Sequence, residues 1–291
     1  MKIKAAARVI CLFLGVCFIP AAAFGATLEE KIGQMIMVGF RGTVADDAPE
    51  IAHDIEAGRI GGVVLFDYDV PTGEYGRNIR SPEQLRRLTA DLRARAPVPL
   101  FIAIDQEGGR VSRLKERCGF SHMPSQRELG RLDDAGATRA AAGITADMLR
   151  AAGINVNFAP VVDLDGNPLN PVIGGLERSF SADPAVVVRH ARVVVETFRR
   201  KGVISTLKHF PGHGSSDADS HAGFVDVTGL WSEKELAPFA TLINEGLADM
   251  VMTAHLFNET IDPLLPATLS RATIGGLLRG RLGYDGVVVS D

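Results

Sequence analysis

Charged and imidazole side chains follow several short apolar runs of this sequence. Asp105, His209 and Asp291 each close such a run. Polar groups at the ends of wholly apolar segments cost free energy to bury, so their repetition favours a functional site over a set of unrelated core residues. Carboxylates and imidazoles are the usual nucleophiles and proton donors of enzymes that cleave bonds with water. The pattern therefore predicts nucleophilic and acid–base chemistry.

The stretch 208–221, KHFPGHGSSDADSH, is the most distinctive part of the chain. Its glycines and small polar residues are typical of a mobile loop. Asp219 and His221 are two residues apart, so in an extended segment both side chains face the same side. A carboxylate beside an imidazole fixes the tautomer of the ring and raises its pKa. The loop therefore predicts a general acid/base that works near neutral pH.

Seven short apolar runs must position these groups. They are rich in Val, Ile, Met and Phe and nearly continuous, which is typical of parallel strands covered on both faces. The runs lie at 34–40, 61–66, 100–105, 155–160, 203–209, 249–255 and 286–291. Amphipathic stretches between them predict helices at 82–96, 138–152, 184–201, 232–245 and 270–282. Ser232 and Glu235 have the spacing of a capping box at the start of one of these helices.

The alternation of strands and helices predicts an α/β protein with a parallel sheet. An open doubly wound sheet and a closed (β/α)8 barrel both fit that order. No G-x-G-x-x-G sequence follows the first run, which weakens the dinucleotide-binding version of the open sheet. We therefore expect a (β/α)8 TIM-type barrel, truncated after about seven strands, with the active site at the C-terminal ends of its strands.

The first 25 residues differ from the rest of the chain. Three cationic residues precede an apolar run at 9–20, and small residues follow it. These are the parts of a secretory signal peptide, and the apolar run is shorter than the roughly 20 residues that span a bilayer. We expect a signal peptide at 1–25 and a catalytic barrel at 26–291. The protein is then exported, either periplasmic or secreted, with no stable membrane span after cleavage.

Composition narrows the class of protein further. The net charge of −4, without any block of like charge, speaks against a surface that binds nucleic acid. Two of the three cysteines lie in the predicted signal peptide, so the mature chain keeps only Cys118 and has no internal disulfide. A domain of about 265 residues can instead be stable through its hydrophobic core.

Five motifs, in order along the chain, carry a family resemblance. They are DQEGGRVSRL at 105–114, NFAPVVDL at 157–164, ERSF at 177–180, KHFPGHG followed by DSH at 208–221, and GVVVSD at 286–291. Together they resemble the N-terminal catalytic domain of glycoside hydrolase family 3, in its bacterial β-N-acetylhexosaminidase branch. The resemblance covers roughly residues 28–291. It implies hydrolysis of terminal, non-reducing β-linked N-acetylhexosamine residues with retention, in peptidoglycan or amino-sugar glycan turnover.

The resemblance also implies a role for individual residues. Asp291 is similar to the nucleophile, and His221 is similar to the acid/base, with Asp219 as its partner. The residues that resemble those holding the sugar ring are Asp105, Arg113, Arg178, Lys208 and His209. Their charged side chains suit a substrate that presents hydroxyl groups on all sides. The implied substrate is a glycan or muropeptide that contains N-acetylglucosamine, and no cofactor or metal is expected.

The chain departs from the family in three ways, one of which is its predicted signal peptide, and other functions stay open. It stops at Asp291, so we expect a C-terminally incomplete barrel from a longer gene product. It also carries an insertion at 67–78, which lines the substrate entrance or only decorates the rim. The alternatives are β-glucosidase-type activity of the same family, a non-catalytic sugar-binding protein, and a metalloenzyme with ligands among His209, His213, His221 and His255.

Overall fold

The computed structural model describes residues 26–291. The predicted signal peptide at 1–25 lies outside these residues. Across the described part, no helix is both long enough and apolar enough to cross a membrane.

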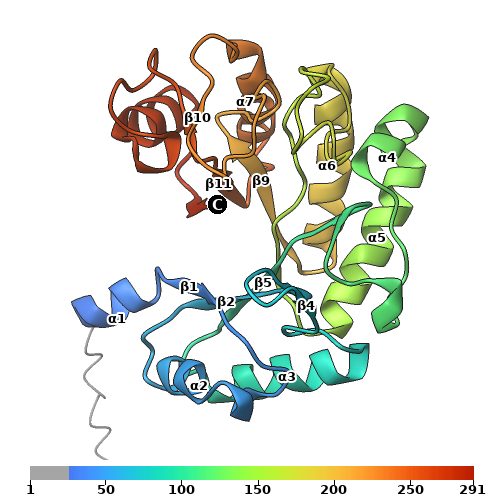
Figure 1. The fold of residues 1–291 in the computed structure, drawn as a ribbon, viewed down its shortest axis with the longest axis vertical. Helices are drawn as coiled ribbons and strands as arrows, with labels where there is room; N and C mark the ends of the chain where they lie inside the picture. The colour runs from blue at the N-terminus through green and yellow to red at the C-terminus, as the bar shows by residue number, and fades with distance from the viewer. Residues whose placement is uncertain (1–25) are drawn as a thin grey trace, which may run out of the picture.

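A seven-stranded parallel sheet forms the centre of the fold, and its strands pair in chain order. The strands are β1 (Met37–Gly39), β2 (Gly62–Leu65), β5 (Phe101–Ile104), β8 (Val156–Asn157), β9 (Ile204–Phe210), β11 (Met250–Thr253) and β13 (Val287–Ser290). The sheet curls into a partial barrel, with β1 and β13 as its two edges (Figure 1). The predicted α/β barrel with about seven strands is confirmed, and each strand lies inside or beside a predicted apolar run.

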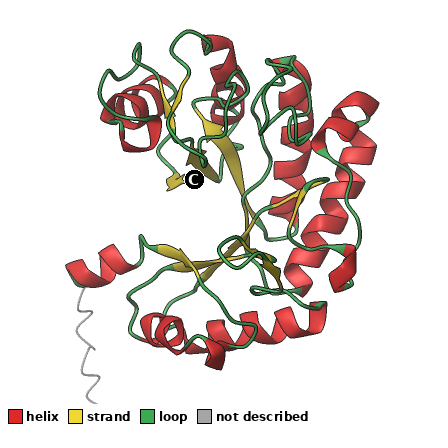
Figure 2. Cartoon of the chain, viewed as in Figure 1, coloured by secondary structure: helices red, strands yellow, loops and turns green. Residues whose placement is uncertain are grey.

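Helices cover the convex side of the sheet (Figure 2). The covering helices are α2 (Pro49–Glu56), α3 (Pro82–Arg95), α4 (Gln126–Leu132), α5 (Ala135–Ala151), α6 (Pro184–Arg200) and α7 (Ala237–Asn244). The short helix α1 (Leu28–Gly33) precedes β1 and lies beside that edge of the sheet (Figure 1). Ser81, Asp134 and Asp183 cap the starts of α3, α5 and α6, each accepting a backbone N–H. Short elements make up the rest: η1 (Ala45–Asp47), β3 (Tyr68–Asp69), β4 (Glu74–Tyr75), β6 (Gln106–Gly108), β7 (Val111–Ser112), η2 (Glu116–Cys118), β10 (Val225–Asp226), η3 (Glu233–Leu236), β12 (Leu256–Phe257), η4 (Ala267–Leu269) and η5 (Ala272–Arg281).

Two apolar clusters lie on the two faces of the sheet. The larger one joins strand residues such as Ile102, Ile104 and Val251 to the helices. A smaller one contains Ala103 and Met252, whose positions alternate with those of the first set. Because successive strand residues point to opposite faces, the smaller cluster belongs to the concave interior of the barrel.

Two predicted helices differ from the sequence-based expectation. The segment 232–245 begins as the 3₁₀ helix η3 before α7, and Ser232 makes no side-chain capping bond, so the predicted capping box is wrong. Glu235 is instead buried against another loop. The predicted helix at 270–282 is the π-helix η5. Its glycines lower the preference for a regular α-helix.

The insertion at 67–78 contains an antiparallel hairpin made of β3 and β4. Gly73 occupies its turn with a φ of 72°, a conformation that favours glycine. The ring of Tyr75 lies against the guanidinium of Arg117, whose Cζ is 3.2 Å from the ring centroid. Arg117 also donates to the buried carboxylate of Asp67 at 2.8 Å. The hairpin is therefore tied to the chain segment that follows β7.

Candidate active site

A cavity of about 750 Å³ opens at the carboxyl ends of the strands and reaches into the barrel. Its polar wall consists of Asp105, Arg113, His221 and Asp291. Its apolar wall comes from the barrel interior and includes Met37, Val64, Phe158, Met252 and Val289. Pockets of a few hundred to a thousand Å³ with a few converging polar groups are typical of small-molecule sites. The cavity has room for sugar units.

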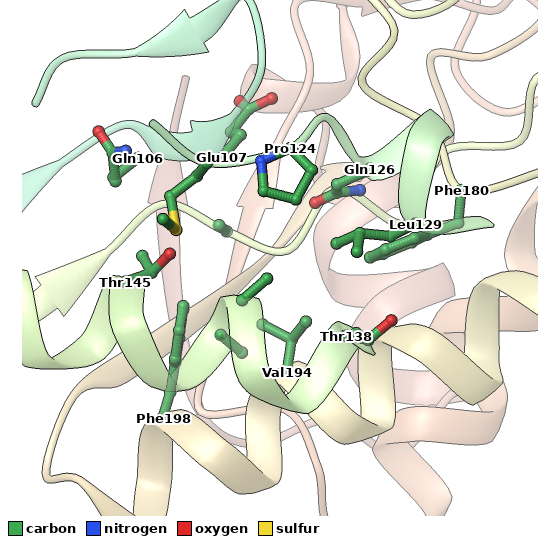
Figure 3. Close-up of a pocket in the computed structure, with 14 residues that line it drawn as sticks. Gln106, Glu107, Pro124, Gln126, Leu129, Thr138, Thr145, Phe180, Val194 and Phe198 are labelled. Carbon is green, nitrogen blue, oxygen red and sulfur yellow. The ribbon is translucent and has the colours of Figure 1, made fainter. Parts of the chain in front are cut away.

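A second cavity lies behind this wall, between the sheet and helices α5 and α6 (Figure 3). Thr138 and Thr145 of α5 and Phe198 of α6 face Gln106 and Glu107 across it. Its volume is about 30 Å³. That space suits about one water molecule, so a sugar ring does not fit there. The candidate active site is the larger cavity.

His221 lies between two carboxylates in the larger cavity. Its Nδ1 is 3.2 Å from Oδ1 of Asp219, and its backbone N–H donates to the same oxygen at 2.9 Å. Its Nε2 is 3.6 Å from Oδ2 of Asp291, a distance for an ion pair rather than a hydrogen bond. The contact with Asp291, helped by Asp219 and opposed by partial burial, raises the pKa of His221 to about 9. The ring is therefore an imidazolium at neutral pH and can donate a proton.

Asp291 follows strand β13 directly, and its backbone N–H donates to the carbonyl of Thr253 on β11. Burial acts to raise the pKa of its carboxyl, but the contacts with His221 and the charge of Lys208 outweigh burial and hold that pKa well below its usual range. The buried Oδ2 has no hydrogen-bond partner. Asp291 thus presents an ionised oxygen to the cavity, as a nucleophile requires.

Lys208 and Arg178 form a buried charge network behind Asp105. The Nζ of Lys208 lies 2.8 Å from Oδ1 of Asp105 and 2.7 Å from Oε1 of Glu107. Arg178 binds both oxygens of Glu107, each at 2.8 Å. Burial acts to raise the pKa of Glu107, but the two cations lower it to about 2. The contact with Lys208 holds the side chain of Asp105 in place at the cavity wall.

His209 belongs to the same network. Its Nδ1 is 2.6 Å from Oδ2 of Asp163, and its Nε2 is 3.0 Å from Nη2 of Arg178. Burial acts to raise the pKa of Asp163, but His209 lowers it below its usual range. An ionised Asp163 accepts a hydrogen bond from Nδ1–H, so Nε2 accepts a hydrogen bond from Arg178. Both ring nitrogens of His209 are therefore occupied by protein groups.

The structure divides the predicted site residues into two groups. Asp105, Arg113, His221 and Asp291 line the cavity, and Asp219 contacts His221. The others stand behind the wall: Arg178, Lys208 and His209. Substrate contact by these three stays a prediction.

Two buried carboxylates beside the cavity wall were absent from the predicted site. Glu107 and Asp163 are the buried anions that pair with Arg178, Lys208 and His209. Their position in the sequence could have indicated them, because both follow the same strands as predicted site residues. A buried cation also requires a nearby anion, which points to these carboxylates once Lys208 is placed at a strand end.

Comparisons with known proteins identify the family of this chain. The model of the glycosyl hydrolase family 3 N-terminal domain matches residues 27–291. β-Hexosaminidase A of Pseudoalteromonas piscicida is 36% identical over 93% of this chain and 49% of its own length. A β-hexosaminidase of Alkalilimnicola ehrlichii is 41% identical over 88% of this chain and 71% of its own length. The solved family 3 β-N-acetylglucosaminidase of Paenibacillus sp. superposes with a TM-score of 0.82 and 42% identity, covering 92% of this chain and 49% of that one. The chain thus spans about half the length of two of these relatives.

Proposed function

Because this chain belongs to glycosyl hydrolase family 3 through its N-terminal domain, we propose that its gene product hydrolyses terminal, non-reducing β-linked N-acetylhexosamine residues with retention. Asp291 is the nucleophile, and His221 with Asp219 is the acid/base. The substrate class follows from the relatives, which are a β-hexosaminidase and a β-N-acetylglucosaminidase. β-Glucosidase-type activity is the alternative within the family.

The observation that carries this proposal is the contact between His221 and Asp291. Nε2 of His221 is 3.6 Å from Oδ2 of Asp291. Inverting glycosidases keep their two groups roughly 6.5–9.5 Å apart to hold a water molecule, whereas retaining enzymes bring them to about 5–5.5 Å. A separation of 3.6 Å is too short to place a water molecule between Nε2 of His221 and Oδ2 of Asp291, which speaks against the inverting arrangement. Direct attack by the carboxylate is the remaining route.

The charges of the pair support a two-step reaction. In the first step, Asp291 attacks the anomeric carbon while the imidazolium of His221 protonates the leaving oxygen. Asp291 then becomes an uncharged ester, which removes the main cause of the raised pKa of His221. The ring can now accept a proton from water, and the resulting hydroxide cleaves the ester. Two displacements at the same carbon restore the β configuration.

The wall of the cavity supports binding of a sugar ring. Asp105 accepts hydrogen bonds from sugar hydroxyls, and Arg113 donates to them, so together they suit two neighbouring oxygens. Arg113 Nε is buried without a hydrogen-bond partner, and a bound ligand can satisfy it. Apolar side chains such as Phe158 and Met252 suit the apolar face of the ring. Asp105 and Arg113 thus suit the binding of sugar hydroxyls, beside the reacting pair His221 and Asp291.

We also propose a place and a role for the protein. The pattern of residues 1–25 supports export to the periplasm or the medium. The glycans that an exported N-acetylhexosaminidase meets are peptidoglycan and other amino-sugar polymers. The proposed role is therefore turnover of such glycans outside the cytoplasm.

A panel of aryl β-glycosides tests the proposal. The natural gene product is assayed on aryl β-glycosides of N-acetylglucosamine, glucose and xylose, and proton NMR follows the first-formed anomer. We expect preference for N-acetylglucosamine and a first-formed β-anomer. Preference for glucose would favour the β-glucosidase alternative, and a first-formed α-anomer would exclude Asp291 as a nucleophile. Binding without turnover of any glycoside would favour a sugar-binding protein.

A further inference from the structure

A buried carboxylate binds the first part of the loop that carries His221. We call this part, residues 212–215, the loop base. Glu235 of η3 is 4% exposed. Its Oε2 accepts the backbone N–H of Gly214 at 2.9 Å, and its Oε1 accepts the hydroxyl of Ser215. The donors lie 20 and 21 residues earlier in the chain, just after strand β9. Glu235 therefore ties the outer helical layer to the start of the acid/base loop.

The loop base is closely packed on two sides, at Gly212 and at Gly214. A Cβ added at Gly212 would lie 2.5 Å from Cβ of Glu235. A Cβ added at Gly214 would lie 1.8 Å from the carbonyl oxygen of Leu164. The backbone is therefore held between Glu235 and the segment after β8. A shift of Glu235 must move the loop.

His213 connects the loop base to the residue before His221. Its backbone N–H donates to Asp163 at 2.8 Å. Its Nδ1 is 2.7 Å from the hydroxyl of Ser216, and its Nε2 is 3.1 Å from the hydroxyl of Ser220. An unbroken path of contacts thus runs from Glu235 through the loop base to His221.

We propose that Glu235 is a positioning residue, which holds the acid/base loop so that His221 faces Asp291. This inference rests on the function proposed above for His221. The ionised carboxylate is the form that suits the task, because it accepts from two donors at once. An amide at this position keeps one acceptor but points an N–H₂ group at the second donor. A glutamine would therefore hold the loop base less firmly than the carboxylate does.

The charge of Glu235 has no evident use for stability. Burial raises its pKa to about 7, with Asp163 adding to the effect and Ser215 opposing it. An acid whose pKa is raised by folding stabilises the fold most below its ordinary pKa, and loses that contribution as the pH rises through 7. Above pH 7 the buried charge therefore opposes folding. A glutamine removes that buried charge but leaves one donor without an acceptor, so the unfolding temperature must be measured beside activity to separate positioning from stability.

The test compares Glu235→Gln with Glu233→Gln in the natural gene product at pH 8. Glu233 is the matched control, because it lies in the same 3₁₀ helix, is exposed, and pairs only with Arg281 at the surface. The substrates are aryl N-acetyl-β-glucosaminides with good and poor leaving groups. For Glu235→Gln we expect kcat to fall about tenfold or more on the poor leaving group and less than about twofold on the activated one, with KM little changed. We expect Glu233→Gln to match wild type on both.

A second variant and a second readout keep the test decisive. Ser215→Ala removes one donor to Glu235, so its effect should be smaller, and the double variant should be non-additive with Glu235→Gln. NMR titration of His221 needs no turnover: its pKa, about 9 in the intact loop, should fall in Glu235→Gln as the contact with Asp291 loosens.

Two results would overturn the positioning role of Glu235, and a third would separate it from the function proposed for His221. A wild-type-like Glu235→Gln, in kinetics and in the titration of His221, overturns the inference. An equal loss across leaving groups, together with a lower unfolding temperature, also overturns it by indicating a merely structural role. If His221→Ala shows no dependence on the leaving group while Glu235→Gln still lowers the pKa of His221, the proposed function fails and the positioning of the loop stands.

Discussion

The pairing of His221 with Asp291 predicts how the imidazole titrates when the carboxylate is removed. Replacing Asp291 with asparagine keeps the size of the side chain and removes its charge. The pKa of His221 should then fall from about 9 toward the ordinary 6.5, because Asp291 is the largest cause of the increase. A pKa of 9 leaves the ring about 97% protonated at pH 7.5, whereas 6.5 leaves about 9%. The variant should therefore hold a largely neutral imidazole at that pH.

Histidine ring resonances followed by NMR against pH measure this directly, with His221→Ala identifying the signal among the seven histidines. Asp219→Asn is the control, and it should lower the pKa less, since Asp219 contributes less than Asp291. More than half of the His221 side chain is exposed, so high salt should also lower the wild-type pKa. An unchanged pKa in Asp291→Asn, or a larger fall in Asp219→Asn, would refute the pairing.

Three further predictions follow from the same site and from the N-terminal sequence. His221→Ala should lose on the order of 10²–10⁴-fold in rate on poor leaving groups and much less on activated ones, as aryl-glycoside kinetics will measure; an equal loss would make His221 a binding residue. Lys208→Met should lower the free energy of unfolding by about 3–5 kcal/mol at pH 7, because it leaves two carboxylates facing each other in a buried site. Urea unfolding measures this, and a loss below about 1 kcal/mol would contradict the network. Mature protein should begin near Ala26 by N-terminal sequencing, and intact Met1 on cytoplasmic protein would contradict export.

Much of the fold followed from local patterns. Each of the seven apolar runs contains or borders a strand of the sheet, because parallel strands covered on both faces need continuous apolar sequence. The polar residues at strand ends met in one cavity, because the carboxyl ends of a parallel barrel share one face. Asp105, His221 and Asp291 all line that cavity, and their roles stay predictions.

The buried partners of the site residues could not be predicted, because they depend on contacts between distant parts of the sequence. Ser232 and Glu235 have capping-box spacing, yet Glu235 binds Gly214 and Ser215, which only the fold brings near. Likewise the sequence shows that Lys208 and Arg178 are cations but not which anions they meet. Glu107, which pairs with both, could be recognised only once the strands were assembled.

Trapping the covalent intermediate tests the central claim most directly. A fluorinated N-acetylglucosaminyl fluoride forms the glycosyl-enzyme quickly and releases it slowly, so the natural gene product can be digested and its labelled peptide sequenced by mass spectrometry. We predict a single N-acetylglucosaminyl label on the carboxylate of Asp291, and none in Asp291→Asn. A label on another residue, or steady turnover of a natural glycan by Asp291→Asn, would contradict the assignment of Asp291 as the nucleophile.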